Sequence, residues 1–134
     1  MKASIEDRIA IEDMFTAYCA EIDRRSDANV AAGFYIEDGA MDNTALGSPL
    51  VEGRAAVAET ISGMFASMSN LEHYLSNFLL HTMDTDEAAA QTYVQAHGTP
   101  NGGNAFAMRG IYHLKARRAD GVWKIARLTF QPFG

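Results

Sequence analysis

The spacing of apolar residues divides the chain into a helical first half and a β-rich second half. Near the start, apolar side chains recur every three or four residues, which predicts an amphipathic helix; they are Ile11, Phe15, Tyr18 and Ile22. Ser4 followed by Asp7 forms a weak capping box at the start of this helix. A short helix is expected over 27–32, where Gly33 ends it, and a third helix over 54–68.

The second half alternates apolar and polar residues from Asn70 onward, which is the period of a β-strand. Three turn signals divide it into four strands: Asp84-Thr85-Asp86, Pro100-Asn101-Gly102-Gly103 and Asp120-Gly121. Residues 34–52 add one or two short strands around a loop. Helices followed by an antiparallel meander predict an α+β fold, with three N-terminal helices packed on one face of a curved, mainly antiparallel sheet.

The turn centres also predict which residues face one another across the hairpins. A turn centred on Thr85 places His73 opposite His97, and a two-residue loop at 101–102 places Phe106 beside His97. Paired residues share a face of the sheet. The predicted inner face mixes apolar with a few polar groups, as a ligand cavity does; besides Trp123 and Ile125 it carries His73, Leu75, Asn77, Tyr93, Gln95, His97, Phe106, Met108, Tyr112, Gln131 and Phe133. One unrecognised bulge would move half of these side chains to the other face.

Two titratable residues stand out as candidates for chemistry. Asp23 ends the first helix inside its apolar arc, so its carboxylate needs a hydrogen-bonding or charged partner. A helix cap or an ion pair with Arg24 or Arg25 is the alternative. His73 is either a structural strand residue or a base, since imidazole titrates near neutrality and a carboxylate on its far nitrogen fixes the tautomer.

Composition narrows the class of protein. The chain has 134 residues, 48% of them hydrophobic, and a net charge of −6, which excludes disorder, collagen and a disulfide scaffold. The Lys and Arg residues are scattered, so neither nucleic acid nor a membrane surface is an expected partner. A single Cys19, a start unlike a signal peptide and the lack of a long apolar run lead us to expect a cytoplasmic protein.

No metal or cofactor is expected from the motifs. His73 and His81 lie too far apart along one strand to share an ion, and no helix follows Gly102-Gly103 to make a phosphate loop. Cys19 is expected to be a packing residue. Arg117-Arg118 are expected to be a solvated hairpin end.

Four segments of the chain resemble the SnoaL-like group of the nuclear transport factor 2-like superfamily. They are AIEDMFTAYCAEIDRR, LEHYLSN, TYVQAHG and RRADGVWKIARLTF. Within this group they are most similar to the branch of scytalone dehydratase and hexachlorocyclohexane dehydrochlorinase. The resemblance covers nearly the whole chain and implies a single domain over 1–134, a cone of three helices and a strongly curved sheet around a deep pocket.

The resemblance also implies roles for individual residues. Asp23 matches the family's aspartate at the end of the first helix, His73 its histidine base, and His97 the second histidine of scytalone dehydratase-like members. Ile22 departs from the pattern, since those enzymes carry a tyrosine there. Near Met108 and Gly110 they carry a serine and an asparagine, which this chain lacks.

Two further family features have candidate counterparts in this chain. The role of polarising a substrate carbonyl would fall to Tyr93, Tyr112, Asn77 or Gln131. Arg127 is the candidate for the arginine of dehydrochlorinase-like members, but the predicted register places it far from His73 and makes it structural.

These observations predict a cofactor-independent lyase or isomerase acting on a small, mainly apolar, cyclic or aromatic substrate. His73 would be the base, Asp23 would orient it, and His97 would donate a proton. The predicted substrate-binding residues are Tyr18, Leu75, Asn77, Tyr93, Gln95, Phe106, Met108, Tyr112, Gln131 and Phe133. The alternatives are a non-catalytic ligand-binding or accessory-subunit domain and a purely structural dimerisation domain.

A homo-oligomer, either dimer or trimer, is expected from the resemblance and from the outer face of the predicted sheet. That face carries more apolar side chains than a monomer usually leaves to water; they are Tyr74, Phe78, Leu80, Val94 and Ile111.

Overall fold

The computed structural model describes residues 4–134. Its helices are α1 (Ile5–Arg24), α2 (Ala28–Ala32) and α3 (Arg54–Ser67), and a short 3-10 turn, η1, spans Thr44–Leu46. Its strands are β1 (Tyr35–Asp42), β2 (Val51–Glu52), β3 (Met68–Met83), β4 (Glu87–Pro100), β5 (Phe106–Ala119) and β6 (Val122–Pro132).

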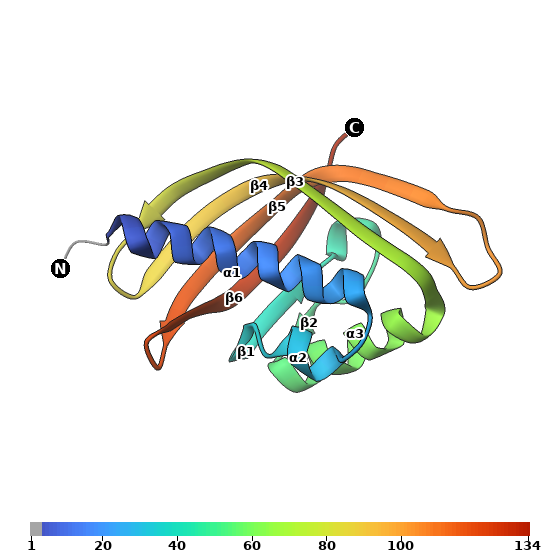
Figure 1. Ribbon diagram of the computed structural model, residues 1–134, viewed down its shortest axis with the longest axis horizontal. Coiled ribbons are helices and arrows are strands. Elements are labelled where there is room, and N and C mark those ends of the chain that lie inside the picture. The colour runs from blue at the N-terminus through green and yellow to red at the C-terminus, as the bar shows by residue number, and fades with distance from the viewer. Residues whose placement is uncertain (1–3) are drawn as a thin grey trace.

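The described strands form one sheet in the order β2-β1-β6-β5-β4-β3. Neighbouring strands are antiparallel except β1 and β6, which run parallel. Figure 1 shows the long strands arching over α1, with α2 and α3 gathered on the same side of the sheet. The predicted α+β fold, with three helices packed on a curved and mainly antiparallel sheet, is confirmed.

Helix α1 forms where the apolar spacing predicts it. Ser4 caps its start: the Ser4 hydroxyl accepts the Asp7 N–H at 3.1 Å, and the Asp7 carboxylate accepts the Ser4 N–H at 3.3 Å. The helix ends where Arg25 adopts a left-handed φ of 51°. Its apolar stripe is buried against the concave side of the sheet and consists of Ile11, Phe15, Tyr18, Cys19 and Ile22.

The turn at Asp120-Gly121 is confirmed, but the loop after Pro100 is longer than predicted. Both Asp120 and Gly121 have positive φ, as a two-residue hairpin requires. Between β4 and β5, by contrast, the chain runs unpaired from Asn101 to Ala105. Strand β4 is therefore displaced by one residue relative to the prediction.

Bulges in the β3–β4 and β5–β6 pairings add further differences from the predicted register. Asn77 has a φ of 57°, and the pairing of β3 with β4 shifts between Ser76 and Leu79 and again between Leu80 and Thr82. A further shift separates Lys115 from Ala116 in the pairing of β5 with β6. Because side chains alternate along a strand, each one-residue shift reverses the face that they occupy.

The predicted faces are therefore partly wrong. His73 pairs with Ala96, and His97 pairs with Glu72 on the opposite face. The predicted inner positions that lie outside are Asn77, Tyr93, Gln95, His97, Gln131 and Phe133, whereas His73, Leu75, Phe106, Met108, Tyr112, Trp123 and Ile125 lie inside.

The outer face was also only partly predicted. Tyr74 and Ile111 lie on it, but Phe78, Leu80 and Val94 pack inward, with Val94 only 2% exposed. Its actual large apolar groups include Leu79, Tyr93 and Phe133. The homo-oligomer stays a prediction.

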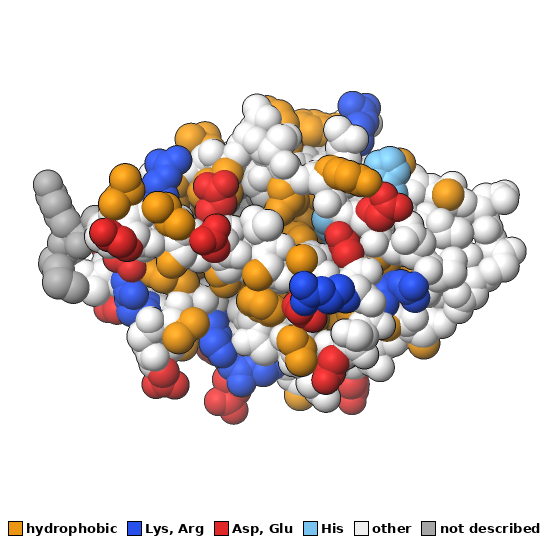
Figure 2. Space-filling model, in the orientation of Figure 1, with side chains coloured by type: hydrophobic (Ala, Val, Ile, Leu, Met, Phe, Trp, Pro, Cys, Tyr) orange, Lys and Arg blue, Asp and Glu red, His pale blue; other side chains and the backbone are white. Residues whose placement is uncertain are grey.

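Charged groups are dispersed on the face of the molecule seen in Figure 2, where Lys and Arg side chains alternate with Asp and Glu. This arrangement matches their scattering along the sequence. None of the helices in residues 4–134 combines the length and the low polarity needed to cross a lipid bilayer.

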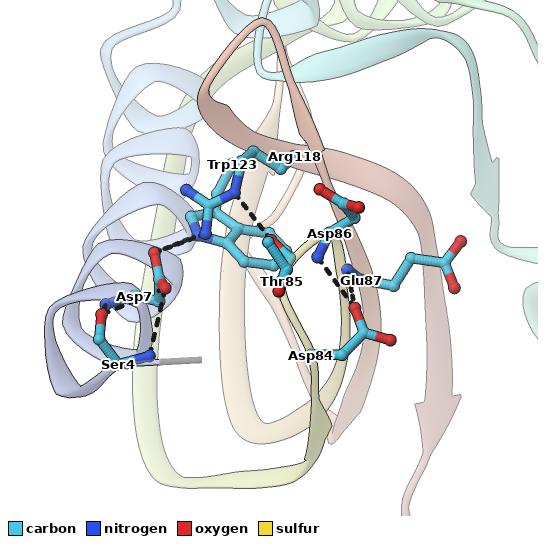
Figure 3. Close-up of polar contacts among 8 residues, drawn as sticks. All are labelled: Ser4, Asp7, Asp84, Thr85, Asp86, Glu87, Arg118 and Trp123. Atoms are coloured by element: carbon cyan, nitrogen blue, oxygen red, sulfur yellow. Dashed lines mark hydrogen bonds and ion pairs between the residues drawn. The ribbon is translucent and has the colours of Figure 1, made fainter. Parts of the chain in front are cut away.

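The start of α1 is bound to the ends of two hairpins. Asp7 Oδ1 accepts hydrogen bonds from Arg118 at 2.7 Å and from the Trp123 indole at 3.1 Å (Figure 3). Arg118 Nε donates to the Thr85 carbonyl at 2.8 Å, and its guanidinium lies 4.6 Å from the Trp123 ring centroid. The prediction of a solvated hairpin end is therefore wrong for Arg118, which joins three elements.

This network predicts a pH-dependent stability. The Arg118 bond, followed by the Trp123 bond, holds the pKa of Asp7 well below its usual range. Such a carboxylate stabilises the fold above the ordinary aspartate pKa of about 4, and the contribution is lost as the pH falls through the depressed value. We expect Asp7→Asn to lower the Tm at neutral pH, and the difference from wild type to shrink in acid.

Thermal unfolding followed by circular dichroism across this pH range measures the effect. Asp13→Asn is the matched control, because Asp13 is exposed on the same helix, and it should leave the Tm nearly unchanged. A deficit of Asp7→Asn that stays constant with pH would contradict the assignment.

Candidate active site

A mainly apolar cavity of about 160 Å³ lies between the end of α1, the end of α3 and the concave side of the sheet. The polar residues of its wall are Tyr18, Asn43, His73, His97 and Tyr112. The apolar wall is formed by Ile22, Met41, Leu46, Met64, Met68, Leu71, Ala96, Phe106, Met108, Leu128 and Phe130. No Lys, Arg, Asp or Glu contributes to this wall within the described part of the chain.

Asp23 and His73 meet at the edge of this cavity. His73 Nδ1 lies 2.6 Å from Asp23 Oδ1, and the His73 backbone N–H donates to Asp23 Oδ2 at 3.0 Å. Both carboxylate oxygens therefore bind the same residue. The His73 side chain is 11% exposed and that of Asp23 is 29% exposed, so the pair is partly shielded from water.

The alternative roles for Asp23 are excluded by the partners of its neighbours. Arg24 pairs with Glu21, and Arg25 donates to the Met68 carbonyl at 2.8 Å. The residue that closes α1 is Arg25 itself. Asp23 is thus neither the helix cap nor the partner of an arginine, and its contacts are with His73.

The contact also fixes the state of the imidazole. A carboxylate can only accept hydrogen bonds, so the proton of a neutral His73 ring lies on Nδ1. Nε2 then carries a free lone pair. The Tyr112 hydroxyl lies 3.5 Å from Nε2, and both groups border the cavity. The basic nitrogen of His73 therefore faces the space in which a ligand would sit.

Tyr112 is held as a neutral hydroxyl beside this nitrogen. Burial raises the pKa of Tyr112 well above its usual range, and the neighbouring Cys19 and Tyr18 add to the effect. The rings of Phe15 and Phe130 pack against it with centroids 5.5 Å and 5.6 Å away. These contacts orient the hydroxyl toward His73.

Tyr18 and Cys19 are less available for chemistry. The Tyr18 hydroxyl is hydrogen-bonded to the Tyr35 hydroxyl at 2.8 Å. Burial raises the pKa of the Cys19 thiol, which keeps it protonated. Cys19 belongs to the buried core cluster, in agreement with the prediction of a packing role.

The other predicted site residues lie in three different places: the cavity, a separate groove and the outer face of the sheet. Tyr18, Phe106 and Met108 line the cavity. Leu75 and Asn77 instead line a separate groove between α1 and β3, which also contacts Asp23 and His73. The remaining predicted residues, Tyr93, Gln95, Gln131 and Phe133, lie on the outer face of the sheet.

The placement of His97 corrects the predicted pair of facing histidines. Its ring packs edge-on against Tyr74, with centroids 5.6 Å apart, and it pairs with Glu72 across the strands. His97 borders the cavity, but its ring does not meet that of His73. The bulge in β3 and the longer loop after β4 account for the difference.

Arg127 has the structural role that was predicted for it. It donates to Asp42 Oδ2 at 2.6 Å, while Asp42 Oδ1 accepts the N–H and the hydroxyl of Thr44 at 3.0 Å and 2.7 Å. The Thr44 bonds and then the Arg127 bond hold the pKa of Asp42 below its usual range. Arg127 is absent from the cavity wall.

Sequence reasoning missed the wall of the cavity contributed by the loop after β1 and by the end of α3. Asn43 and Leu46 lie in a segment without any period, so no pattern indicated their direction. Met64 lies on α3, as predicted, but Met68, which was expected to end that helix, is the first residue of β3. The helical spacing of apolar residues also does not distinguish core from cavity. Within residues 4–134, no group of three or more His, Cys, Asp or Glu side chains is arranged to hold a metal.

The chain is similar to a known domain family and to several solved structures. Residues 3–129 match the model of the SnoaL-like domain family. A candidate aromatic ring hydroxylase from Novosphingobium aromaticivorans is 32% identical in sequence, with a TM-score of 0.94 over 99% of this chain and 93% of that chain. No curated protein matches the chain in sequence.

Two more distant structures share the fold. A candidate scytalone dehydratase from Novosphingobium aromaticivorans is 22% identical, with a TM-score of 0.86 over 97% of this chain and 86% of that chain. A hexachlorocyclohexane dehydrochlorinase is 20% identical, with a TM-score of 0.81 over 97% of this chain and 90% of that chain. The resemblance inferred from the sequence is confirmed for the family and the fold.

The geometry predicts the tautomer of His73. In ¹⁵N-resolved NMR spectra at a pH where the ring is neutral, we expect the proton on Nδ1. Asp23→Asn offers one acceptor oxygen to two donors, the Nδ1–H and the backbone N–H, so this preference should weaken.

Glu21→Gln is the control, since Glu21 lies on the same helix but binds Arg24. It should leave the His73 tautomer unchanged. A proton found on Nε2 in the wild-type protein would contradict the proposed orientation of the base.

Proposed function

The chain belongs to the SnoaL-like domain family, and on that premise we propose that it is a cofactor-independent lyase or isomerase with His73 as its base. The observation that carries the proposal is the pair of hydrogen bonds from His73 to Asp23. They leave Nε2 unprotonated and directed toward an apolar cavity. A base in such a place can remove a proton from carbon.

The proposed reaction begins with transfer of a proton from substrate carbon to His73 Nε2. In an elimination, the C–H electron pair forms a carbon–carbon double bond while the leaving group departs with its own electrons. In an isomerisation, the electrons form an enolate, and the imidazolium returns the proton to another carbon. Asp23 stabilises the imidazolium in both cases because its carboxylate already accepts the Nδ1 proton.

The cavity supports a small and neutral substrate. Its volume of about 160 Å³ is close to that of an engineered protein cavity of ~150 Å³ that holds benzene. The described wall offers no charged side chain to neutralise a carboxylate or ammonium group. A single ring with few polar substituents fits both properties.

The names of two structural neighbours agree with an elimination. One is a candidate dehydratase and the other a dehydrochlorinase. His97 is not part of the proposal, since its ring packs against Tyr74. Tyr112 takes its place as the hydroxyl nearest Nε2, where it can donate a hydrogen bond to a leaving group or an enolate oxygen.

Removal of the base tests the proposal directly. We expect the protein to catalyse deuterium incorporation next to the carbonyl of cyclohexanone in D₂O, and loss of water from 3-hydroxycyclohexanone. His73→Ala should lower both rates by about 10²–10⁴-fold, the usual contribution of a general base. NMR and the absorbance of the enone product measure the two reactions.

His73→Ala should still fold and bind cyclohexanone, because the cavity wall remains. The control is His113→Ala, since His113 lies on β5 and is hydrogen-bonded to Gln131. Equal rates in wild type and His73→Ala would refute the role of His73. A protein that binds these ketones without reacting would instead be a ligand-binding domain.

The Tyr112 hydroxyl is tested separately. Tyr112→Phe keeps the ring between Phe15 and Phe130 and removes the hydroxyl near Nε2. We expect kcat to fall about tenfold or more, as for a hydrogen bond to a group that develops charge, with little change in Tm. An unchanged kcat would limit Tyr112 to packing.

A further inference from the structure

Asn43 and His97 are the polar residues of the cavity wall whose side chains form no hydrogen bond within residues 4–134, and the His97 ring packs against Tyr74. The Tyr18 hydroxyl binds Tyr35, the His73 ring binds Asp23, and Tyr112 lies against His73. Within residues 4–134, the Asn43 side chain takes part in none of the hydrogen bonds between side chains or from side chain to backbone, and Asn43 is one of the residues that line the cavity. Its amide is therefore free to bind a ligand.

From this we propose that Asn43 anchors the substrate of this site by donating its side-chain N–H to an oxygen of a neutral, single-ring molecule. The inference rests on the proposed function and specifies the substrate further. A ligand filling the cavity would displace water from the amide, and a buried amide without a partner is unfavourable. A substrate oxygen at this point restores the hydrogen bond.

The backbone around Asn43 is fixed before any ligand binds. Asp42, the residue before it, is bound by Arg127 and by both donors of Thr44, the residue after it. The Asn43 carbonyl accepts the Leu46 N–H at 2.9 Å, which closes η1. The backbone that carries this amide therefore loses little conformational entropy when a ligand binds.

The sheet order places the anchor and the base on opposite sides of the cavity. Asn43 follows β1, whereas His73 lies on β3, the far edge of the sheet after β6, β5 and β4. The wall between them is apolar, with Met108, Leu128 and Phe130. A substrate bound here thus presents its oxygen to one side and its acidic C–H to the other.

Two ring probes of the same shape test the anchor by binding alone. Cyclohexanone carries the oxygen, and methylenecyclohexane replaces it with a CH₂ group. Asn43→Leu keeps a similar side-chain volume but has no N–H. We expect it to weaken the binding of cyclohexanone about 2- to 10-fold. The Kd of methylenecyclohexane should stay the same or decrease. Ligand titrations followed by NMR give both constants.

A second variant and a control separate the hydrogen bond from local packing. Asn43→Asp keeps the shape of the side chain and removes the N–H donor. It should therefore also weaken the binding of cyclohexanone more than that of methylenecyclohexane. Gln95→Leu removes an amide from the outer face, where Gln95 pairs with Tyr74, and should change neither Kd. An unchanged cyclohexanone Kd in both Asn43 variants, or an equal loss for both probes, would overturn the assignment.

Different measurements would contradict the role of Asn43 as anchor and the role of His73 as base. The selective effect of Asn43→Leu on cyclohexanone binding should persist when His73 is replaced by Ala, because it does not depend on proton transfer. If His73→Ala abolishes turnover but the Asn43 variants show no ketone-selective effect, the role of His73 as base stands and the role of Asn43 as anchor is overturned. If the Asn43 variants weaken ketone binding selectively but the wild-type protein catalyses no deuterium exchange, the role of Asn43 stands and the role of His73 is overturned.

Discussion

The candidate site depends on one carboxylate that accepts two hydrogen bonds from a single residue. Asp23 binds both the ring and the backbone N–H of His73. Because Asp23 lies in the last turn of α1 and His73 near the start of β3, these bonds join the helical layer to the edge of the sheet. The contacts that select the tautomer of the ring therefore also hold the base at the wall of the cavity. The two carboxylate oxygens of Asp23 thus set both the place of the His73 ring and the nitrogen that carries its proton.

Much of this arrangement could be predicted from local patterns, and the errors have identifiable causes. Helical spacing placed Asp23 at the inner side of α1, and strand alternation placed His73 and Tyr112 inward. His97 was misplaced because two features have weak signals in the sequence. A bulge formed at Asn77 without a glycine, and the loop after Pro100 is longer than its Asn-Gly pair suggests. Each moves the register by one residue, which reverses a whole strand.

The wall around Asn43 could not be predicted for a different reason. Its position depends on a contact between Asp42 and Arg127, which lie 85 residues apart in the chain. No hydrophobic period passes through a loop, and an asparagine after a strand is ordinary turn chemistry. Only the folded chain shows that Asn43 lines the same cavity as His73, while Arg127, which was a candidate for chemistry, holds the loop.

Helix α1 is bound to the sheet by a carboxylate near each end, and the partners of the two carboxylates explain why only the second is proposed to take part in chemistry. Asp7 accepts from Arg118 and from the Trp123 indole, and neither donor releases its proton near neutral pH. Asp23 accepts from an imidazole, whose second nitrogen can take up a proton. At the first end the charges of the partners do not change near neutral pH, so the interaction there contributes to stability alone. At the second end the charge of the partner changes when Nε2 takes a proton, and the carboxylate stabilises the charged form more than the neutral one. The difference between these two states is the part of the interaction that can lower a reaction barrier.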